Sequence, residues 1–190
     1  MTTRSIHEFD DLMKDLLINV NTLGCVMLPT EPFDLFGEGR DRLLDTEDLY
    51  VSSNPAKFWV NGDVSDDAHV TLHAGLMQPA YLQKDYVDTV LEAWDRPEYL
   101  APTGITFFPS PDKLESDYAA IVVEFDDPSL IEAHQRLSYL PHVNTFPDYN
   151  PHMTLAYVRL DAAQRWMDIL SQAEFHVYVT DGELNYGSAE

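Results

Sequence analysis

The chain has 190 residues and a formal net charge of −22, with 45% hydrophobic and 12% aromatic residues. This hydrophobic content argues against a disordered acidic tail and is enough for a sizeable core. The negative field repels long polyanions, so general binding to DNA or RNA is disfavoured. We interpret the charge as a solubility feature with a preference for small substrates as its consequence, and an acidic mimic of nucleic acid is the alternative.

No apolar run approaches the roughly 20 residues that span a bilayer. The N-terminal residues 1–8 lack the apolar core of a signal peptide. We therefore expect a single domain over 1–190, in the cytoplasm and without a membrane partner. Cys25 is the only cysteine, which excludes an internal disulfide and a cysteine-rich zinc site.

Hydrophobic periodicity predicts alternating helices and strands. Residues 33–48 are rich in Gly, Asp and Glu and predict an exposed loop or irregular helix, which could act as a lid. In chain order, the expected elements are a helix over 6–17, strands over 25–28, 49–51, 57–60 and 69–76, a helix over 82–94, strands over 104–108 and 118–125, a helix over 129–139, a strand over 152–158, a helix over 162–172 and a strand over 175–180. A short strand or a tail is expected over 183–190. This order predicts an antiparallel or mixed α+β fold with outer helices and a groove between two sheets.

One four-residue pattern occurs twice, as His69-Val70-Thr71-Leu72 and His152-Met153-Thr154-Leu155. Side chains of an extended strand alternate between faces, so each His shares a face with its Thr while the apolar residues face the core. Two such strands side by side would set two imidazoles across a shallow groove, each with a hydroxyl beside it.

These residue types suit phosphodiester cleavage without a metal. One proton must leave the nucleophile and another must reach the leaving oxygen, and an imidazole with a pKa of about 6.5 can do either. Such acid–base assistance contributes roughly 10²–10⁴-fold per group. Hydroxyls of Thr71 and Thr154 can donate to the non-bridging oxygens, where charge accumulates. Repetition of the motif favours a catalytic site over two structural histidines.

The two motifs resemble those of the 2H phosphoesterase superfamily, with Pro151-His152-Met153-Thr154-Leu155 as the most specific segment. The resemblance covers about residues 25–180. It implies a bilobal fold of two pseudo-symmetric antiparallel sheets, a metal-independent site without cofactors, and catalysis by His69, Thr71, His152 and Thr154. Family members cleave 2′,3′-cyclic phosphates, 2′–5′ bonds or cyclic nucleotides. Within the family we favour the phage enzymes that hydrolyse cyclic oligonucleotide alarm signals, the anti-CBASS type, which would act in the host cytoplasm.

Three residues outside the motifs are candidate substrate contacts. His73 shares the face of His69 if the strand stays regular, Tyr149 could stack on a base, and Glu183 could accept hydrogen bonds from a base edge. The remaining aromatic and imidazole side chains near the motifs are assigned structural places: Tyr157 to the core, His134 and His142 to the surface.

Two other classes of function compete with this reading. A metal-dependent hydrolase could use His69, His73 and His152 with Asp66 or Asp67, but it leaves both threonines unexplained. A non-enzymatic acidic protein could sequester a nucleotide signal or mimic nucleic acid, binding tightly without product.

Overall fold

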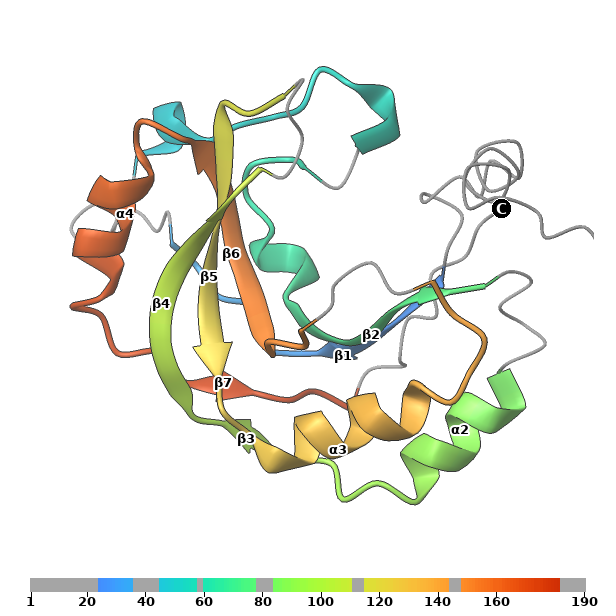
Figure 1. Ribbon diagram of the computed structural model, residues 1–190. Coiled ribbons are helices and arrows are strands. Elements are labelled where there is room, and N and C mark those ends of the chain that lie inside the picture. Colours follow the sequence, from blue (N-terminus) through green and yellow to red (C-terminus); the bar gives the residue numbers. More distant parts are fainter. Residues whose placement is uncertain are drawn as a thin grey trace, which may run out of the picture.

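The computed structural model describes residues 24–35, 45–57, 60–77, 84–110, 115–143 and 148–181. It confirms the α+β class, with antiparallel strands and helices on the outside (Figure 1). The strands are β1 (Gly24–Pro29), β2 (His69–Leu76), β3 (Tyr99–Leu100), β4 (Pro102–Pro109), β5 (Tyr118–Phe125), β6 (His152–Arg159) and β7 (Val177–Tyr178). The helices are α2 (Lys84–Glu92), α3 (Pro128–Leu137) and α4 (Ala163–Leu170), with short 3₁₀ turns at Thr46–Asp48, Pro55–Lys57 and Ser65–Asp67.

Five strands form one sheet in the order β1-β2-β6-β5-β4, and β3 pairs with β7 separately. The two motif strands are therefore neighbours, as the motifs require. They are joined by the single pair Val70–Met153, and beyond it they diverge (Figure 1). The two expected sheets are thus two halves of one sheet, with the motif strands meeting at the junction.

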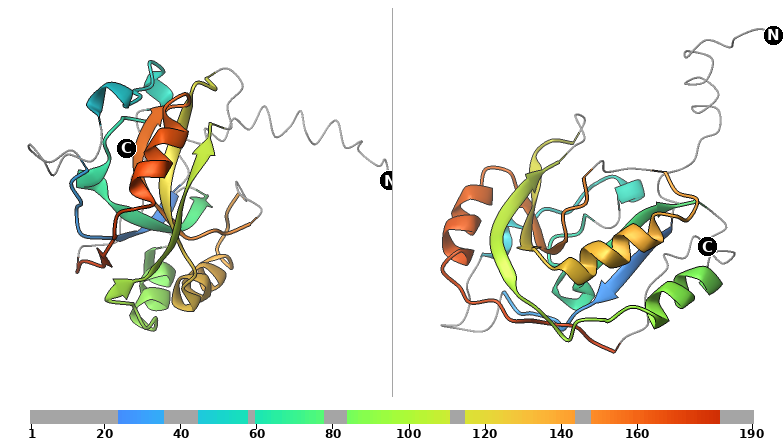
Figure 2. Two further views of the ribbon diagram at one scale, coloured as in Figure 1. Left: turned by 90° about the vertical axis from the view of Figure 1, so that its left-hand side faces the viewer. Right: turned by 60° about the horizontal axis from the view of Figure 1, so that its bottom comes forward.

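Each half of the sheet is covered by its own helices. Helix α3 packs against β2 and against α2, whereas α4 packs against β4 and β5. The left view of Figure 2 shows α4 in front of the sheet and α2 with α3 below it. The apolar faces of α3 and α4 join the strand residues in one core, which includes Val70, Leu72, Ile121, Val123, Leu130, Met153, Leu155 and Trp166. The opposite face of the sheet carries the motif His and Thr residues.

Local sequence explains most of these elements. Asp127 caps α3 by accepting a hydrogen bond of 2.8 Å from the amide of Ser129, and Pro128 occupies the first turn as predicted. Strands β5 and β6 and helix α3 lie within two residues of their predicted bounds. The predicted strand over 57–60 is wrong at Lys57, which belongs to a 3₁₀ turn, and residues 49–51 contribute only isolated bridges. The predicted helix over 6–17 and the segment 183–190 lie outside the described residues.

The segment that precedes each motif strand pairs with the other motif strand. Before the first motif, Asp63 bridges Ala156 of β6; before the second, His142 bridges Leu76 of β2. Gly75 makes the second crossing possible, because it has φ +84° and a Cβ there would lie 2.2 Å from the carbonyl oxygen of Val143. The crossed segments extend the pseudo-symmetry of the two halves beyond the motifs.

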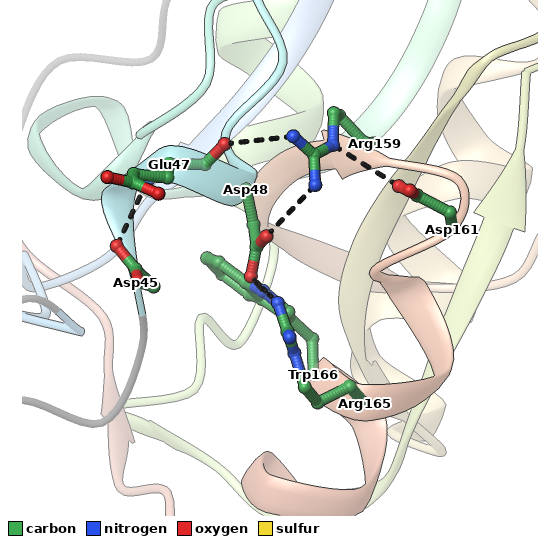
Figure 3. Close-up of polar contacts among 7 residues, drawn as sticks. All are labelled: Asp45, Glu47, Asp48, Arg159, Asp161, Arg165 and Trp166. Carbon is green, nitrogen blue, oxygen red and sulfur yellow. Dashed lines mark hydrogen bonds and ion pairs between the residues drawn. The ribbon is translucent and has the colours of Figure 1, made fainter.

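The acidic segment 33–48 is less exposed than predicted. Leu35 joins the core, and the side chain of Asp48 is buried beside α4. Its carboxylate accepts hydrogen bonds from the Trp166 indole at 3.0 Å and from Arg165, and pairs with Arg159 at 3.4 Å (Figure 3). Burial opposes ionisation, but the hydrogen bonds and both guanidinium charges outweigh it and lower the pKa of Asp48. The described ends of this segment are therefore anchored; residues 36–44 lie outside the description.

None of the helices in the described part of the chain has the length and apolar character needed to cross a bilayer.

Candidate active site

The junction brings the two motifs side by side. The strands pair there at Val70 and Met153, the middle residues of the two His-x-Thr triplets. Side chains alternate along a strand, so the His and Thr on either side of each middle residue point to the face opposite it. Both His and both Thr are part-exposed, while the residues between them are buried. The expected juxtaposition of the two motifs is therefore present in the structure.

The two histidines are held by the same contact. The Nδ1 atom of His69 lies 2.7 Å from the carbonyl oxygen of Asp67, and the Nδ1 atom of His152 lies 2.7 Å from that of Asn150. In both cases the carbonyl belongs to the residue two positions earlier. A carbonyl oxygen can only accept, so Nδ1 carries the proton and donates it.

This contact decides which nitrogen can react. With Nδ1–H held by a carbonyl, Nε2 is the atom that gains or loses a proton in each ring. A neutral ring then offers an Nε2 lone pair as a base, and a protonated ring offers Nε2–H as an acid. Both motifs present the same nitrogen for acid–base work.

The threonine hydroxyls of the two motifs are available to a ligand. Among the described residues, neither the Thr71 nor the Thr154 hydroxyl makes a hydrogen bond. The same part of the chain holds no group of three or more His, Cys, Asp or Glu side chains that could bind a metal ion. The backbone carbonyl of Thr71 accepts a hydrogen bond of 3.0 Å from the Tyr149 hydroxyl. The ring of Tyr149 stacks on His134 with centroids 3.9 Å apart, and burial raises its pKa. Tyr149 thus connects the backbone of the first motif strand to the ring of His134. Its contact with a base stays a prediction.

The predicted position of His73 is wrong. Thr71 faces Met27 of β1 and His73 faces Val26, so Leu72 forms a bulge and the alternation of faces reverses after it. His73 consequently points inward and is only 3% exposed. Its ring lies 5.1 Å from that of His134 and 4.7 Å from that of His142, between centroids. His73 therefore does not share the face of His69 and Thr71.

The predicted surface positions of His134 and His142 are also wrong, because both rings are part-buried against His73. Their Nδ1 atoms lie 2.8 Å from the carbonyl oxygens of Leu72 and Leu140, respectively. Neither ring nitrogen of His73 has a hydrogen-bond partner in the described structure. The three rings form a cluster around the buried His73, which the sequence did not reveal.

An equivalent bulge at Leu155 alters the predicted place of Tyr157. Val122 pairs with Thr154 and Ile121 with Ala156, so Tyr157 turns to the face of the motif residues and is absent from the core. It meets Tyr118 edge-on at 6.1 Å, and burial together with Tyr118 raises the pKa of Tyr157 to about 12. Its predicted place in the core is wrong. Glu183, the third candidate substrate contact, lies outside the described residues.

Comparison with known proteins gives a structural likeness only. No protein-family model matches the chain, and no curated protein matches it. Among solved structures, Kluyveromyces marxianus Usb1 matches with a TM-score of 0.47 at 12% identity, over 80% of this chain and 83% of that one. The same protein with uridine monophosphate matches with a TM-score of 0.46 at 13% identity, over 80% and 84%. At this similarity neither structure assigns an activity to the chain.

Sequence reasoning missed two neighbours of His152. The ring of Phe108 meets the imidazole edge to face, with centroids 5.1 Å apart. Glu124 of β5 is the direct cross-strand partner of His152. Alternation within β4 and β5 could have placed both side chains on one face, but pairing of these strands with β6 was needed to bring them to His152.

Proposed function

We propose that the protein is a metal-independent phosphodiesterase of the 2H type that cleaves small nucleotide phosphodiesters. The observation that carries this proposal is the matched pair of imidazoles at the junction of β2 and β6. Each has Nδ1 fixed by a carbonyl two residues earlier, and the two strands pair at the residue between each His and its Thr. An in-line displacement at phosphorus needs one group that accepts a proton from the nucleophile and another that donates a proton to the leaving oxygen. The two imidazoles can supply these two groups.

In the proposed reaction one ring is neutral and the other is protonated. Nε2 of the neutral ring takes the proton of a ribose 2′-hydroxyl or a water as its oxygen bonds to phosphorus. Nε2–H of the other ring donates its proton to the leaving 5′-oxygen as that P–O bond breaks. Thr71 and Thr154 donate hydrogen bonds to the non-bridging oxygens. Attack by the 2′-hydroxyl produces a 2′,3′-cyclic phosphate, and attack by water produces a linear monoester.

Within this class we propose cyclic oligonucleotide signals as the first substrates to test. The net charge of −22 disfavours long RNA. Electrostatic repulsion of a small cyclic dinucleotide or trinucleotide is weaker, because screening is nearly complete beyond about 8 Å at physiological ionic strength. Mononucleotide 2′,3′-cyclic phosphates and 2′–5′ dinucleotides are the alternative substrates.

The test is chromatography of these three substrate groups after incubation with the protein in EDTA. Wild type is compared with His69→Ala, His152→Ala and the control His176→Ala, whose ring is exposed on a different part of the fold. Cleavage by wild type and the control, with a loss of about 10²–10⁴-fold in each motif variant, supports the proposal. Equal cleavage by all four proteins, or loss of cleavage in EDTA, contradicts it. Binding without product would favour sequestration.

A further inference from the structure

We infer that Glu124 selects guanine as the substrate base that lies next to His152. The inference rests on the proposed function and names a base preference for it. Glu124 and His152 are direct partners of the β5–β6 ladder, so both side chains lie on the face of the motif residues. Within the described residues, the Glu124 carboxylate has no ion pair and accepts no hydrogen bond. A carboxylate without a protein donor beside a reactive imidazole is available to a substrate.

The surroundings of the carboxylate leave room for a planar ligand. Gly104 of β4 is the cross-strand partner of Glu124 on its other side. A Cβ built at Gly104 would meet only the Oε2 atom of Glu124, at 4.0 Å, so the space above this residue is open. The ring of Phe108, on the same strand face as Gly104, contacts His152. Glu124 is therefore flanked by Gly104 on one strand and His152 on the other, and its carboxylate lies beside open space over Gly104.

Chemistry singles out guanine among the four bases. A carboxylate only accepts hydrogen bonds, through two parallel oxygens. Guanine presents two adjacent donors, N1–H and the N2 amino group, which match both oxygens. Adenine and cytosine present one amino group beside an acceptor nitrogen, and uracil presents one N–H between two carbonyls. Only guanine offers a separate N–H donor to each carboxylate oxygen.

The backbone of Glu124 is held independently of any ligand. Its carbonyl oxygen accepts a hydrogen bond of 3.0 Å from the Thr103 hydroxyl, and its strand pairs on both sides. Replacing Glu124 by Gln keeps the shape and the strand while converting one acceptor oxygen into a donor. This substitution therefore tests recognition without removing a buried group.

The experiment compares kcat/KM for cyclic di-GMP and cyclic di-AMP, and for 2′,3′-cyclic GMP and AMP, in wild type and Glu124→Gln. The control is Glu174→Gln, an exposed position that undergoes the same charge change. We expect wild type to prefer guanine and Glu124→Gln to lose about 10- to 100-fold on the guanine substrates alone, within the range for one bidentate pair. Gly104→Val, which fills the open space, should weaken cleavage of guanine substrates at an unchanged melting temperature.

The outcomes separate this inference from the proposed function. Cleavage of guanine and adenine substrates at equal rates, unchanged in Glu124→Gln, overturns the inference and leaves the phosphodiesterase intact. A uniform fall in kcat on all bases with a displaced pH profile also overturns it, and assigns Glu124 to positioning His152. No cleavage of any substrate by wild type rejects the proposed function itself.

Discussion

Strands β2 and β6 carry the same motif and the same bulge, but they differ at the residue that follows the bulge. Burial alternates identically along both strands through their first seven residues. After the bulge, β2 turns His73 inward, whereas β6 turns Ala156 inward. Ala156 packs in the apolar core, and His73 meets two further imidazoles. The two halves therefore share the local geometry of the motif and support it with different side chains.

The features that both halves share are those that the proposed reaction would use. The carbonyl contact to Nδ1, the Thr two residues on and the bulge after Leu occur in both halves. The material behind the strand does not repeat: a histidine cluster lies behind β2, and an Asp–Arg–Trp network ties a loop to α4 beyond the end of β6. Substitutions behind the strands should consequently change stability, while substitutions at the motifs change activity.

The largest expected loss of stability comes from Gly75→Ala, at the crossing over β2. The added Cβ would meet the Val143 carbonyl oxygen, and φ +84° is unfavourable for alanine. We expect unfolding to become easier by about 3 kcal/mol, measured by urea denaturation. Gly104→Ala is the matched control, because its Cβ would enter open space. Equal stability of the two variants would contradict the role of the crossing.

In the second half, Asp48→Asn should destabilise by somewhat less than this. It removes the charge that two arginines face, and it sets an amide against the Trp166 indole. The arginines left behind are half-exposed, so the cost is that of losing hydrogen bonds to a charged group, about 2 kcal/mol. Asp168→Asn, on an exposed face of α4, removes one charge as well and serves as the control. A melting temperature of Asp48→Asn that matches this control would show that the network contributes little.

A third variant, His73→Phe, replaces the buried imidazole with an apolar ring. It makes this position of β2 apolar, as Ala156 is at the equivalent position of β6. Burial, followed by the nearby His142 and His134, lowers the pKa of His73 to about 4 from 6.5. Between these values the unfolded chain binds a proton that the folded protein does not, so the stability of wild type falls as the pH decreases from 6.5 to 4. His73→Phe lacks this contribution.

The free-energy difference between His73→Phe and wild type should therefore move in favour of the variant by at most about 3 kcal/mol between pH 7 and pH 4. Urea denaturation at both values measures it. A difference that does not depend on pH would mean that His73 is protonated as easily in the folded protein as in the unfolded chain.

The smallest effect is expected for Tyr149→Phe. It removes the hydrogen bond from the Tyr149 hydroxyl to the Thr71 carbonyl and keeps the ring stacked on His134. One such bond contributes about 1 kcal/mol. We expect a loss of that size in stability, with activity on the test substrates reduced less than tenfold. A loss of activity as large as that of His69→Ala would instead place Tyr149 in contact with substrate.

Local information in the chain was sufficient for the fold class and the central elements. Alternation of apolar residues predicted β5 and β6, and Pro128 with its preceding Asp marked the start of α3. Strand β3, the crossings and the anchoring of Asp48 were missed, since each depends on a partner far away in the sequence. The reversal of His73 and Tyr157 was missed because a bulge is defined by the register of two strands.

By itself, the sequence determined that two His-x-Thr motifs lie on strands with one apolar face, because this pattern has a period of two within each strand. Only the tertiary structure decided that the strands meet at the Val70–Met153 pair, which sets the two motifs side by side. It also decided that His73 is buried and that Glu124 stands beside His152. These relations join residues about 28 to 83 positions apart, and such distances are closed by packing and strand register, not by the local preferences of the chain.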